Sequence, residues 1–433
     1  MNGTTSSSAE LSHTSSARAV SGSSNAGTKS GPLDAYTLKQ LHERTSVKWT
    51  EYPADVLPLW VAEMDCSPVP AVAEVLMQMM QAGDTGYPGH GAGTVEKARS
   101  NAVDYRNLPT YQEAYRMFAQ ERWGLSLAPE QVAGMPDVMQ GVKQAVAMLS
   151  LKKLVINTPV YPPFRMYPAE AGAEILEADL TPLGRVDFDQ LEALFEQADG
   201  FLLCNPHNPT GVAHTREELT RLFELANAKN VRVIVDEIHA PLTSPQEAAT
   251  LGSEPYVPAL SVPGSERAVV LFSAAKGFNL AGFKAALMIV GTEAIPDLAR
   301  VPETVFHSSA TLSIAAHTAA LVYGSEWLDQ VRAAIDNRRA QFHEGLARVA
   351  PKAKVLPASA TYFAWVDFSK VEFEGSAMGA DAAKILLEHA KVAFNPGETF
   401  GRGGEGHVRV NLATTPEVIE EVLSRIAAAL GQR

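Results

Sequence analysis

Hydrophobic and polar positions alternate in blocks along the middle of the chain. Five short apolar runs predict buried strands, at residues 153–157, 201–204, 231–235, 268–272 and 285–290. Amphipathic stretches lie between them, such as 216–229, which carries Leu219, Leu222, Phe223 and Ala226 on one helical face. This alternation is typical of helices that cover both faces of a mostly parallel sheet, so the pattern predicts an α/β fold.

The two ends of the chain follow other patterns. A long helical stretch at 325–350, an alternating run at 361–367 and a final Ala-rich helix predict a smaller α+β domain. The first 30 residues are rich in Ser, Thr, Gly and Ala and predict a disordered tail, because they bury too little apolar surface. The chain has 433 residues, more than the roughly 250–300 that one hydrophobic core supports, so we expect it to divide into several structural parts. These are the tail at 1–30, a segment at 31–80 that joins the small domain, a large domain at 81–320 and the small domain at 321–433.

Composition narrows the classes of function. A formal net charge of −13 argues against nucleic-acid binding, which needs a basic surface. Cys66 and Cys204 lie far apart without the spacing of a metal site, so we expect two reduced thiols and no metal. No apolar run is long enough to span a membrane and no secretory signal is visible, so we expect a cytoplasmic protein.

Chemically distinctive side chains follow the predicted strands. Lys276 lies in the loop after the run at 268–272, and Asn208, Asp236 and Ser273 also come at or just beyond the carboxyl ends of strands. Parallel strands bring such residues to one edge of the sheet, where α/β folds bind ligands. The set matches the needs of pyridoxal phosphate: an amine for its aldehyde, an acid for its ring nitrogen, a donor for its phenolate oxygen and a cradle for its phosphate.

Three residues take the central roles in this hypothesis. Lys276 is expected to form the Schiff base and then to move the Cα proton of the substrate. Asp236 is expected to pair with the protonated ring nitrogen, and Asn208 to donate its amide to the phenolate oxygen. The alternatives are a solvated lysine, a helix-capping aspartate and a plain turn asparagine.

Five further residues are candidates for cofactor contacts. His239 and Tyr161 could lie against the ring, or could be a structural histidine and a core tyrosine. Ser273 offers a hydroxyl to the phosphate. The backbone N–H groups of Val138 and Met139 begin a predicted helix and could hold the phosphate there, unless this is a plain helix start.

Arg409 is the candidate for binding the substrate. It lies in the alternating stretch 407–412 of the predicted small domain. A planar guanidinium suits bidentate binding of an amino acid's α-carboxylate, whereas the alternative is an arginine that faces outward from its strand.

From about Leu33 to the end, the chain resembles the fold-type I pyridoxal-phosphate enzymes of the class I/II aminotransferase superfamily. It is most similar to their cystathionine β-lyase branch, the C–S lyases of the MalY/PatB type. The segments that carry this resemblance are 57–65, 86–89, 158–164, 236–239, 276–282, 395–397 and 400–401.

The resemblance implies a large domain with a mostly parallel seven-stranded sheet and a smaller α+β domain. It implies a homodimer with its active sites at the interface, in which Tyr87 reaches the neighbour's cofactor phosphate. It also implies an amino acid as the small-molecule substrate. The residues to which it assigns the roles argued above are Lys276, Asp236, Asn208, Tyr161, Ser273 and Arg409.

Three departures from the branch pattern stand out. Pro241 occupies a position that is usually acidic, and Gly277 one where Thr is common. Residues 94–109 look like an insertion beside the substrate entrance, which leaves the substrate's identity open.

The resulting prediction is a β-lyase that acts on cystathionine or a related L-cysteine S-conjugate and yields pyruvate, ammonia and a thiol. An aminotransferase shares every residue named and remains the first alternative. A non-catalytic regulator is the remote one, disfavoured by the intact Lys276 and Asp236 and by the absence of a basic helix-turn-helix before Leu33.

Overall fold

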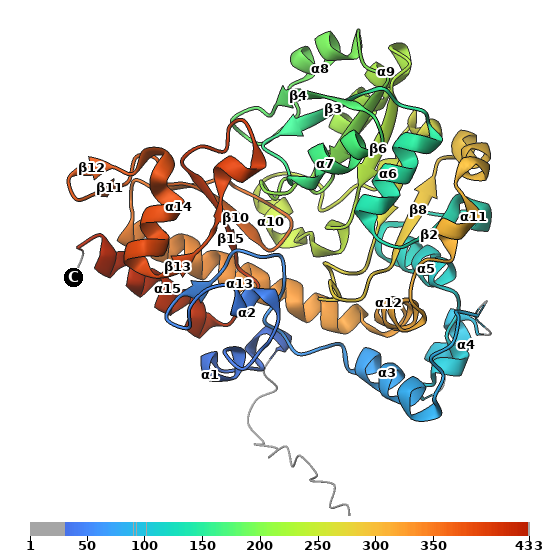
Figure 1. Ribbon diagram of the computed structural model, residues 1–433, viewed down its shortest axis with the longest axis horizontal. Helices are drawn as coiled ribbons and strands as arrows, with labels where there is room; N and C mark the ends of the chain where they lie inside the picture. Colours follow the sequence, from blue (N-terminus) through green and yellow to red (C-terminus); the bar gives the residue numbers. More distant parts are fainter. Residues whose placement is uncertain (1–30, 90, 92, 101, 432–433) are drawn as a thin grey trace, which may run out of the picture. The chain divides into compact units, whose positions relative to one another are not determined.

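A seven-stranded sheet forms the centre of the computed structural model, which describes residues 31–89, 91, 93–100 and 102–431 (Figure 1). The predicted tail at 1–30 lies outside the described residues. The strand order is β2-β8-β7-β6-β5-β3-β4, and only β8 runs antiparallel to its neighbours. The strands are β2 (Val132–Met135), β3 (Lys153–Thr158), β4 (Glu174–Asp179), β5 (Gly200–Cys204), β6 (Arg232–Asp236), β7 (Val269–Phe272) and β8 (Ala286–Val290). The predicted α/β class with a mostly parallel sheet is confirmed.

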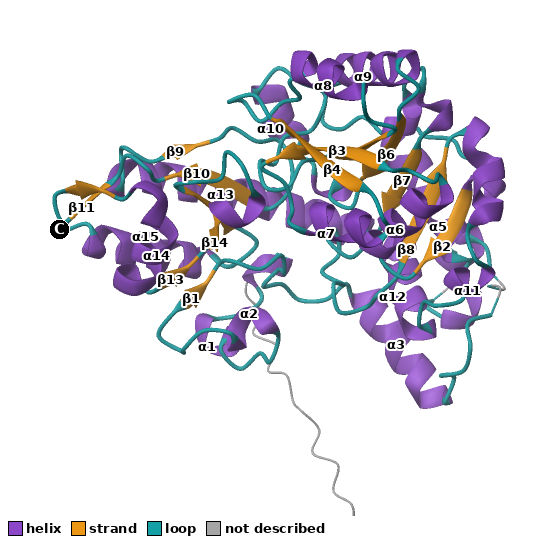
Figure 2. Ribbon diagram, turned by 45° about the horizontal axis from the view of Figure 1, so that its top comes forward, coloured by secondary structure: helices purple, strands orange, loops and turns teal. Residues whose placement is uncertain are grey.

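Helices cover both faces of this sheet, as Figure 2 shows for α8 and α9 on one side and α6 and α7 on the other. Side chains alternate along each strand, so Ile234 of β6 packs with α6 while Val233 and Val235 pack with α9. Burial on both faces explains the continuous apolar runs in the sequence. The helices of the large core are α3 (Pro70–Ala82), α5 (Tyr111–Trp123), α6 (Val138–Met148), α7 (Pro163–Glu170), α8 (Phe188–Phe195), α9 (Arg216–Ala228), α10 (Pro245–Thr250), α11 (Glu303–Phe306) and α12 (Thr311–Tyr323).

A second hydrophobic core forms around a four-stranded antiparallel sheet, ordered β14-β15-β10-β9. Its strands are β9 (Lys354–Val355), β10 (Phe363–Asp367), β14 (Asn395–Pro396) and β15 (His407–Asn411), and α14 (Ala382–Ile385) and α15 (Pro416–Ala429) pack on them. A short hairpin, β11 (Glu372–Phe373) and β12 (Ser376–Ala377), lies at its margin.

Two stretches of chain link the two cores. The 25-residue helix α13 (Ser325–Val349) places Val331 and Ile335 in the large core and Phe342 and Leu346 in the small one. The N-terminal stretch adds α1 (Leu38–Leu41), α2 (Val47–Thr50) and β1 (Leu57–Pro58) to the small core, where β1 pairs with β13 (Val392–Ala393).

The chain passes between the cores at residues 60–66, since Leu59 packs in the small core and Met64 in the large one. On α3, Val72, Val75 and Met79 also pack in the large core. The described part of the 94–109 segment, which includes α4 (Val95–Arg99), also packs there. Arg99 bonds the Val322 carbonyl of α12 and pairs with Glu121 of α5.

Within the described part of the chain, no helix is both long and apolar enough to cross a membrane. The same residues contain no cluster of His, Cys, Asp or Glu arranged to bind a metal ion. Cys66 and Cys204 are both buried free thiols.

Candidate active site

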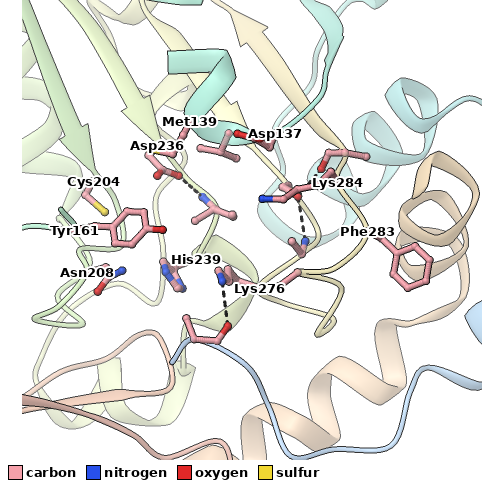
Figure 3. Close-up of a pocket in the computed structure, with 17 residues that line it drawn as sticks. Asp137, Met139, Tyr161, Cys204, Asn208, Asp236, His239, Lys276, Phe283 and Lys284 are labelled. Atoms are coloured by element: carbon pink, nitrogen blue, oxygen red, sulfur yellow. Dashed lines mark hydrogen bonds between the residues drawn. The ribbon is translucent and has the colours of Figure 1, made fainter. Parts of the chain in front are cut away.

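A cavity of about 140 Å³ opens at the carboxyl edge of the central sheet. Figure 3 shows side chains from several strand ends directed toward this common space. All the predicted site residues except Tyr87 and Arg409 line the cavity: Val138, Met139, Tyr161, Asn208, Asp236, His239, Ser273 and Lys276.

Lys276 enters the cavity from the loop after β7. Its Nζ donates a hydrogen bond to the Ala62 carbonyl at 3.0 Å. Burial, with a further contribution from the positive charge of Arg409, lowers the pKa of Lys276 to about 8. A much larger share of this lysine is therefore a neutral, nucleophilic amine at neutral pH than of an exposed lysine.

Asp236 ends β6 and is fully enclosed. One carboxylate oxygen accepts the backbone N–H of Ile238 at 3.0 Å. Burial raises the pKa of Asp236 to about 7, although the Ile238 N–H and the charge of Lys276 act in the opposite direction.

Arg409 lies directly behind the cavity wall on β15. Its Nη1 donates to Asn208 Oδ1 and its Nη2 to the Trp60 carbonyl, both at 2.9 Å. The first contact orients the Asn208 amide, so its NH₂ group is left for another acceptor. Burial lowers the pKa of Arg409 to about 10, and its Nε has no partner among the described residues.

A tyrosine and a histidine complete the inner wall. The Tyr161 side chain is partly exposed, and its backbone N–H donates to the Asn208 carbonyl at 3.1 Å. His239 packs edge-on against Phe363, with the ring centroids 5.6 Å apart. Burial, together with the cations Lys276 and Arg409, holds the pKa of His239 well below its usual range, so the ring is neutral. Its Nδ1 is buried without a hydrogen-bond partner in the described structure.

Comparisons with known proteins identify the family. Residues 55–426 match the model described as aminotransferase class I and II. The chain is 41% identical over 421 residues to a protein of Mycobacterium leprae named "Putative cystathionine beta-lyase", with 93% of this chain and 98% of that protein covered. It is 30% identical over 398 residues to a cystathionine beta-lyase of Corynebacterium glutamicum, with 91% and 99% covered.

A solved structure agrees with these relatives. It is described as a "putative plp-dependent beta-cystathionase" from Corynebacterium diphtheriae, and matches with a TM-score of 0.80 and 32% identity over 93% of this chain and 100% of that one. The chain belongs to the class I and II aminotransferase family. Its relatives lie in the cystathionine β-lyase branch, and its cofactor is pyridoxal phosphate.

The residues of the cavity fit this cofactor of the aminotransferase family. Asp236 is a buried carboxylate in the cavity wall, and a protonated pyridine nitrogen would be a cationic partner for it. Asp137, which also lines the cavity, caps α6 by accepting the Gln140 N–H at 2.9 Å. The N–H groups of Val138 and Met139 in the first helical turn have no intrahelical acceptor and suit a phosphate.

The Ser273 hydroxyl, which we expected to bind phosphate, is bonded to backbone groups in the structure. Its Oγ donates to the Ala285 carbonyl at 2.7 Å and accepts the Ala275 N–H at 3.2 Å. A serine hydroxyl has one hydrogen to donate, and here it is used within the loop.

Lys284 is a cavity residue that the sequence reasoning missed. It precedes β8, which runs antiparallel to β7, so the start of β8 lies at the same sheet edge as the end of β7. An antiparallel assignment of the 285–290 run would have revealed this lysine. Its cation can balance the charge of a phosphate.

Tyr87 lies outside the cavity and is fully exposed. It lines a separate groove with Pro88, His307 and Thr311. Within one chain it is therefore separate from the predicted site.

Two departures from the branch pattern prove to be neighbours. A Cβ atom added to Gly277 would lie 2.8 Å from Cβ of Pro241. Gly277 therefore leaves the space that Pro241 fills. None of the described residues of 94–109 lines the cavity, so within one chain this segment does not border it.

Proposed function

We propose that the protein is a β-lyase that cleaves the C–S bond of cystathionine or a related L-cysteine S-conjugate. The observation that carries this proposal is the near full-length similarity to proteins named cystathionine β-lyase, combined with a cavity that is lined by Lys276 and Asp236 and has Arg409 bonded to its wall residue Asn208. With cystathionine, the reaction consumes one water and releases homocysteine, pyruvate and ammonia.

Three residues of the cavity have separate roles in this reaction. Pyridoxal phosphate, when bound, supplies the electron sink for the charge left at Cα. Lys276 removes the Cα proton, and its depressed pKa of about 8 favours the free amine that this step needs. Asp236 would hold the ring nitrogen as an ionised carboxylate, and Asn208 would donate its amide to the phenolate oxygen.

Arg409 binds the α-carboxylate of the substrate. It is buried, lies over the Phe363 ring at 4.1 Å and is held by Asn208, so its position is fixed before substrate arrives. A charge-assisted contact of this type contributes roughly 1.5–3 kcal/mol.

The remaining residues hold the cofactor. Val138 and Met139 would bind the phosphate through their N–H groups, with the charge of Lys284 and the hydroxyl of Ser273 beside them. Tyr161 would stack on the ring, and His239 would pack against it. The protein acts as a homodimer in which the exposed Tyr87 reaches the phosphate of the partner's cofactor.

Product analysis separates this proposal from the aminotransferase alternative. With L-cystathionine and no oxo acid, we expect pyruvate, ammonia and homocysteine over many turnovers, because elimination returns the enzyme to its starting state. An aminotransferase stops after one half-reaction and resumes only when a 2-oxo acid is added. An oxo-acid analogue of cystathionine formed in stoichiometric amount without pyruvate, or activity that requires an added oxo acid, would favour the aminotransferase.

A further inference from the structure

Residues Trp60–Cys66 connect the two cores, and side chains from distant elements bind their backbone carbonyls. Arg409 binds the Trp60 carbonyl at 2.9 Å, and Lys276 binds the Ala62 carbonyl at 3.0 Å. Two of the residues assigned to the reaction are therefore positioned by this one segment. Further donors to its carbonyls are Arg44, Lys48, Asn279, Tyr362 and Asn411.

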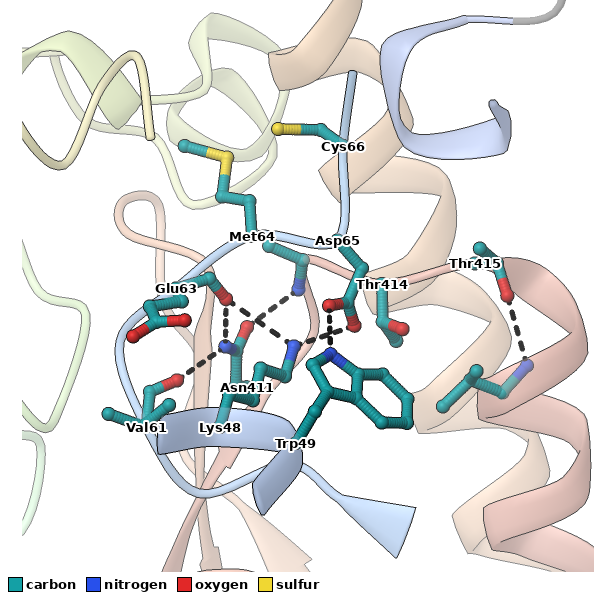
Figure 4. Close-up of polar contacts among 12 residues, drawn as sticks. Lys48, Trp49, Val61, Glu63, Met64, Asp65, Cys66, Asn411, Thr414 and Thr415 are labelled. Atoms are coloured by element: carbon teal, nitrogen blue, oxygen red, sulfur yellow. Dashed lines mark hydrogen bonds and ion pairs between the residues drawn. The ribbon is translucent and has the colours of Figure 1, made fainter. Parts of the chain in front are cut away.

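A buried ion pair lies against the segment, as Figure 4 shows. Lys48 Nζ is 2.6 Å from Asp65 Oδ2, and both side chains are 1% exposed. The other carboxylate oxygen of Asp65 accepts Trp49 Nε1 at 2.9 Å and lies 3.6 Å from Arg44. Asp65 thus has a charged or polar partner on each oxygen.

Lys48 contacts the segment at both ends. Its ammonium donates to the Glu63 carbonyl at 3.4 Å, and its own carbonyl accepts Trp60 Nε1 at 3.4 Å. The neighbouring Trp49 packs in the small core, while Met64 packs in the large one. The ion pair therefore fixes the segment at the place where the chain passes between the cores.

Stability alone does not account for such a pair. Removing two charges from water costs about as much free energy as their attraction returns, so buried pairs are often neutral for stability. What a buried pair with satisfied hydrogen bonds does provide is a defined position for the chain that carries it.

We propose that Lys48 and Asp65 are positioning residues that set the place of Lys276 and Arg409 through the carbonyls of Trp60–Cys66. This inference rests on the roles proposed above for Lys276 and Arg409. Loss of the ion pair shifts the Trp60 and Ala62 carbonyls, so it changes both the binding of the substrate carboxylate and the proton affinity of Lys276.

The test is the double variant Lys48→Met with Asp65→Asn, which removes both charges and keeps an acceptor for Trp49. We expect kcat/KM to fall about tenfold, as for the loss of one well-placed hydrogen bond, mainly through KM. We also expect a shift in the pH titration of the visible absorbance of the lysine-bound cofactor. This spectroscopic readout needs no turnover, so it stays informative if the lyase assignment fails.

The matched control is Arg232→Met with Asp297→Asn. This pair is 2.9 Å apart with side chains 17% and 18% exposed, and it lies at the amino end of β6, the opposite end of the strand from Asp236. It should lower Tm to a similar degree and leave KM and the titration unchanged. Wild-type KM and titration in the first double variant, or equal changes in the control, would overturn the proposal. If the first double variant does not fold, the single variant Asp65→Asn tests the proposal through the same two measurements, KM and the pH titration of the absorbance.

Discussion

Lys276 and Lys284 line the same cavity, but only Lys276 is assigned to bond the cofactor covalently. We expect purified Lys276→Ala to lack the visible absorbance of a lysine-bound cofactor, because no other amine takes its place. Lys284→Ala is the matched control and should keep the band while binding the cofactor more weakly. A borohydride-reducible bond between cofactor and protein in Lys276→Ala would contradict the assignment.

Asp236 and Glu237 are adjacent acids that allow a second comparison. Burial raises the pKa of each to about 7. Asp236 faces the cavity, whereas Glu237 accepts the Ala259 N–H at 2.8 Å. Asp236→Asn should bind cofactor and lower kcat by orders of magnitude, since the ring nitrogen loses its anionic partner. Glu237→Gln keeps its hydrogen bond and should retain most of kcat; equal losses in steady-state kinetics would contradict the distinction.

At the scale of single residues, the sequence predicted eight of the 17 residues that line the cavity. Asn208, Asp236 and Lys276 follow buried strands, and parallel pairing brings such positions together. Lys284 was missed because its place depends on the direction of β8, which an apolar run does not reveal. The hydrogen bond that the Ser273 hydroxyl donates could not be predicted either. Its acceptor is the backbone carbonyl of Ala285, just before β8, and a backbone acceptor leaves no signal in the sequence.

At the scale of elements, the loop after β7 depends on the contact between Gly277 and Pro241. Gly277→Ala places a methyl group 2.8 Å from Cβ of Pro241, and overpacking of this kind costs about 1–3 kcal/mol. We expect a lower Tm and a lower kcat, since Lys276 is adjacent. Gly282→Ala in the same loop meets no atom within 4 Å and should keep the wild-type Tm. Equal melting curves for the two variants would show that the close contact between residue 277 and Pro241 does not affect stability.

In the central sheet, the five predicted runs became β3, β5, β6, β7 and β8, whereas β2 and β4 were not predicted. All five residues of β5 and of β8 are buried, and their apolar runs were recognised. β4 is an edge strand with partly exposed Glu177 and Asp179, so it has no apolar run. β2 is only four residues long and contains Gly134, which weakens the pattern further.

At the scale of the whole molecule, the exposed Tyr87 leads to a prediction about assembly. In a homodimer with shared sites, Tyr87→Ala and Lys276→Ala each impair the protein. Mixed and allowed to exchange subunits, the two variants form hybrids with one intact site. Equal mixing should restore about a quarter of wild-type activity per subunit, measured as pyruvate release. No recovery despite proven exchange would place Tyr87 outside the partner's site.

The arrangement around Trp60–Cys66 lay beyond sequence reasoning. The bond from Arg409 to the Trp60 carbonyl joins residues 349 positions apart, and its acceptor is a backbone atom without a side-chain signature. Lys48 and Asp65 are ordinary charged residues in the sequence, where the usual expectation is exposure to solvent.

The helix α13 has a consequence for how the length of this chain can vary. One residue inserted between Ile335 and Phe342 would rotate the following turns by about 100° and advance them by about 1.5 Å. Phe342 and Leu346 would then leave the small core while Val331 stayed in the large one. In a library of single-residue insertions and deletions, this stretch should therefore be among the least permissive, whereas exposed loop tips absorb such changes.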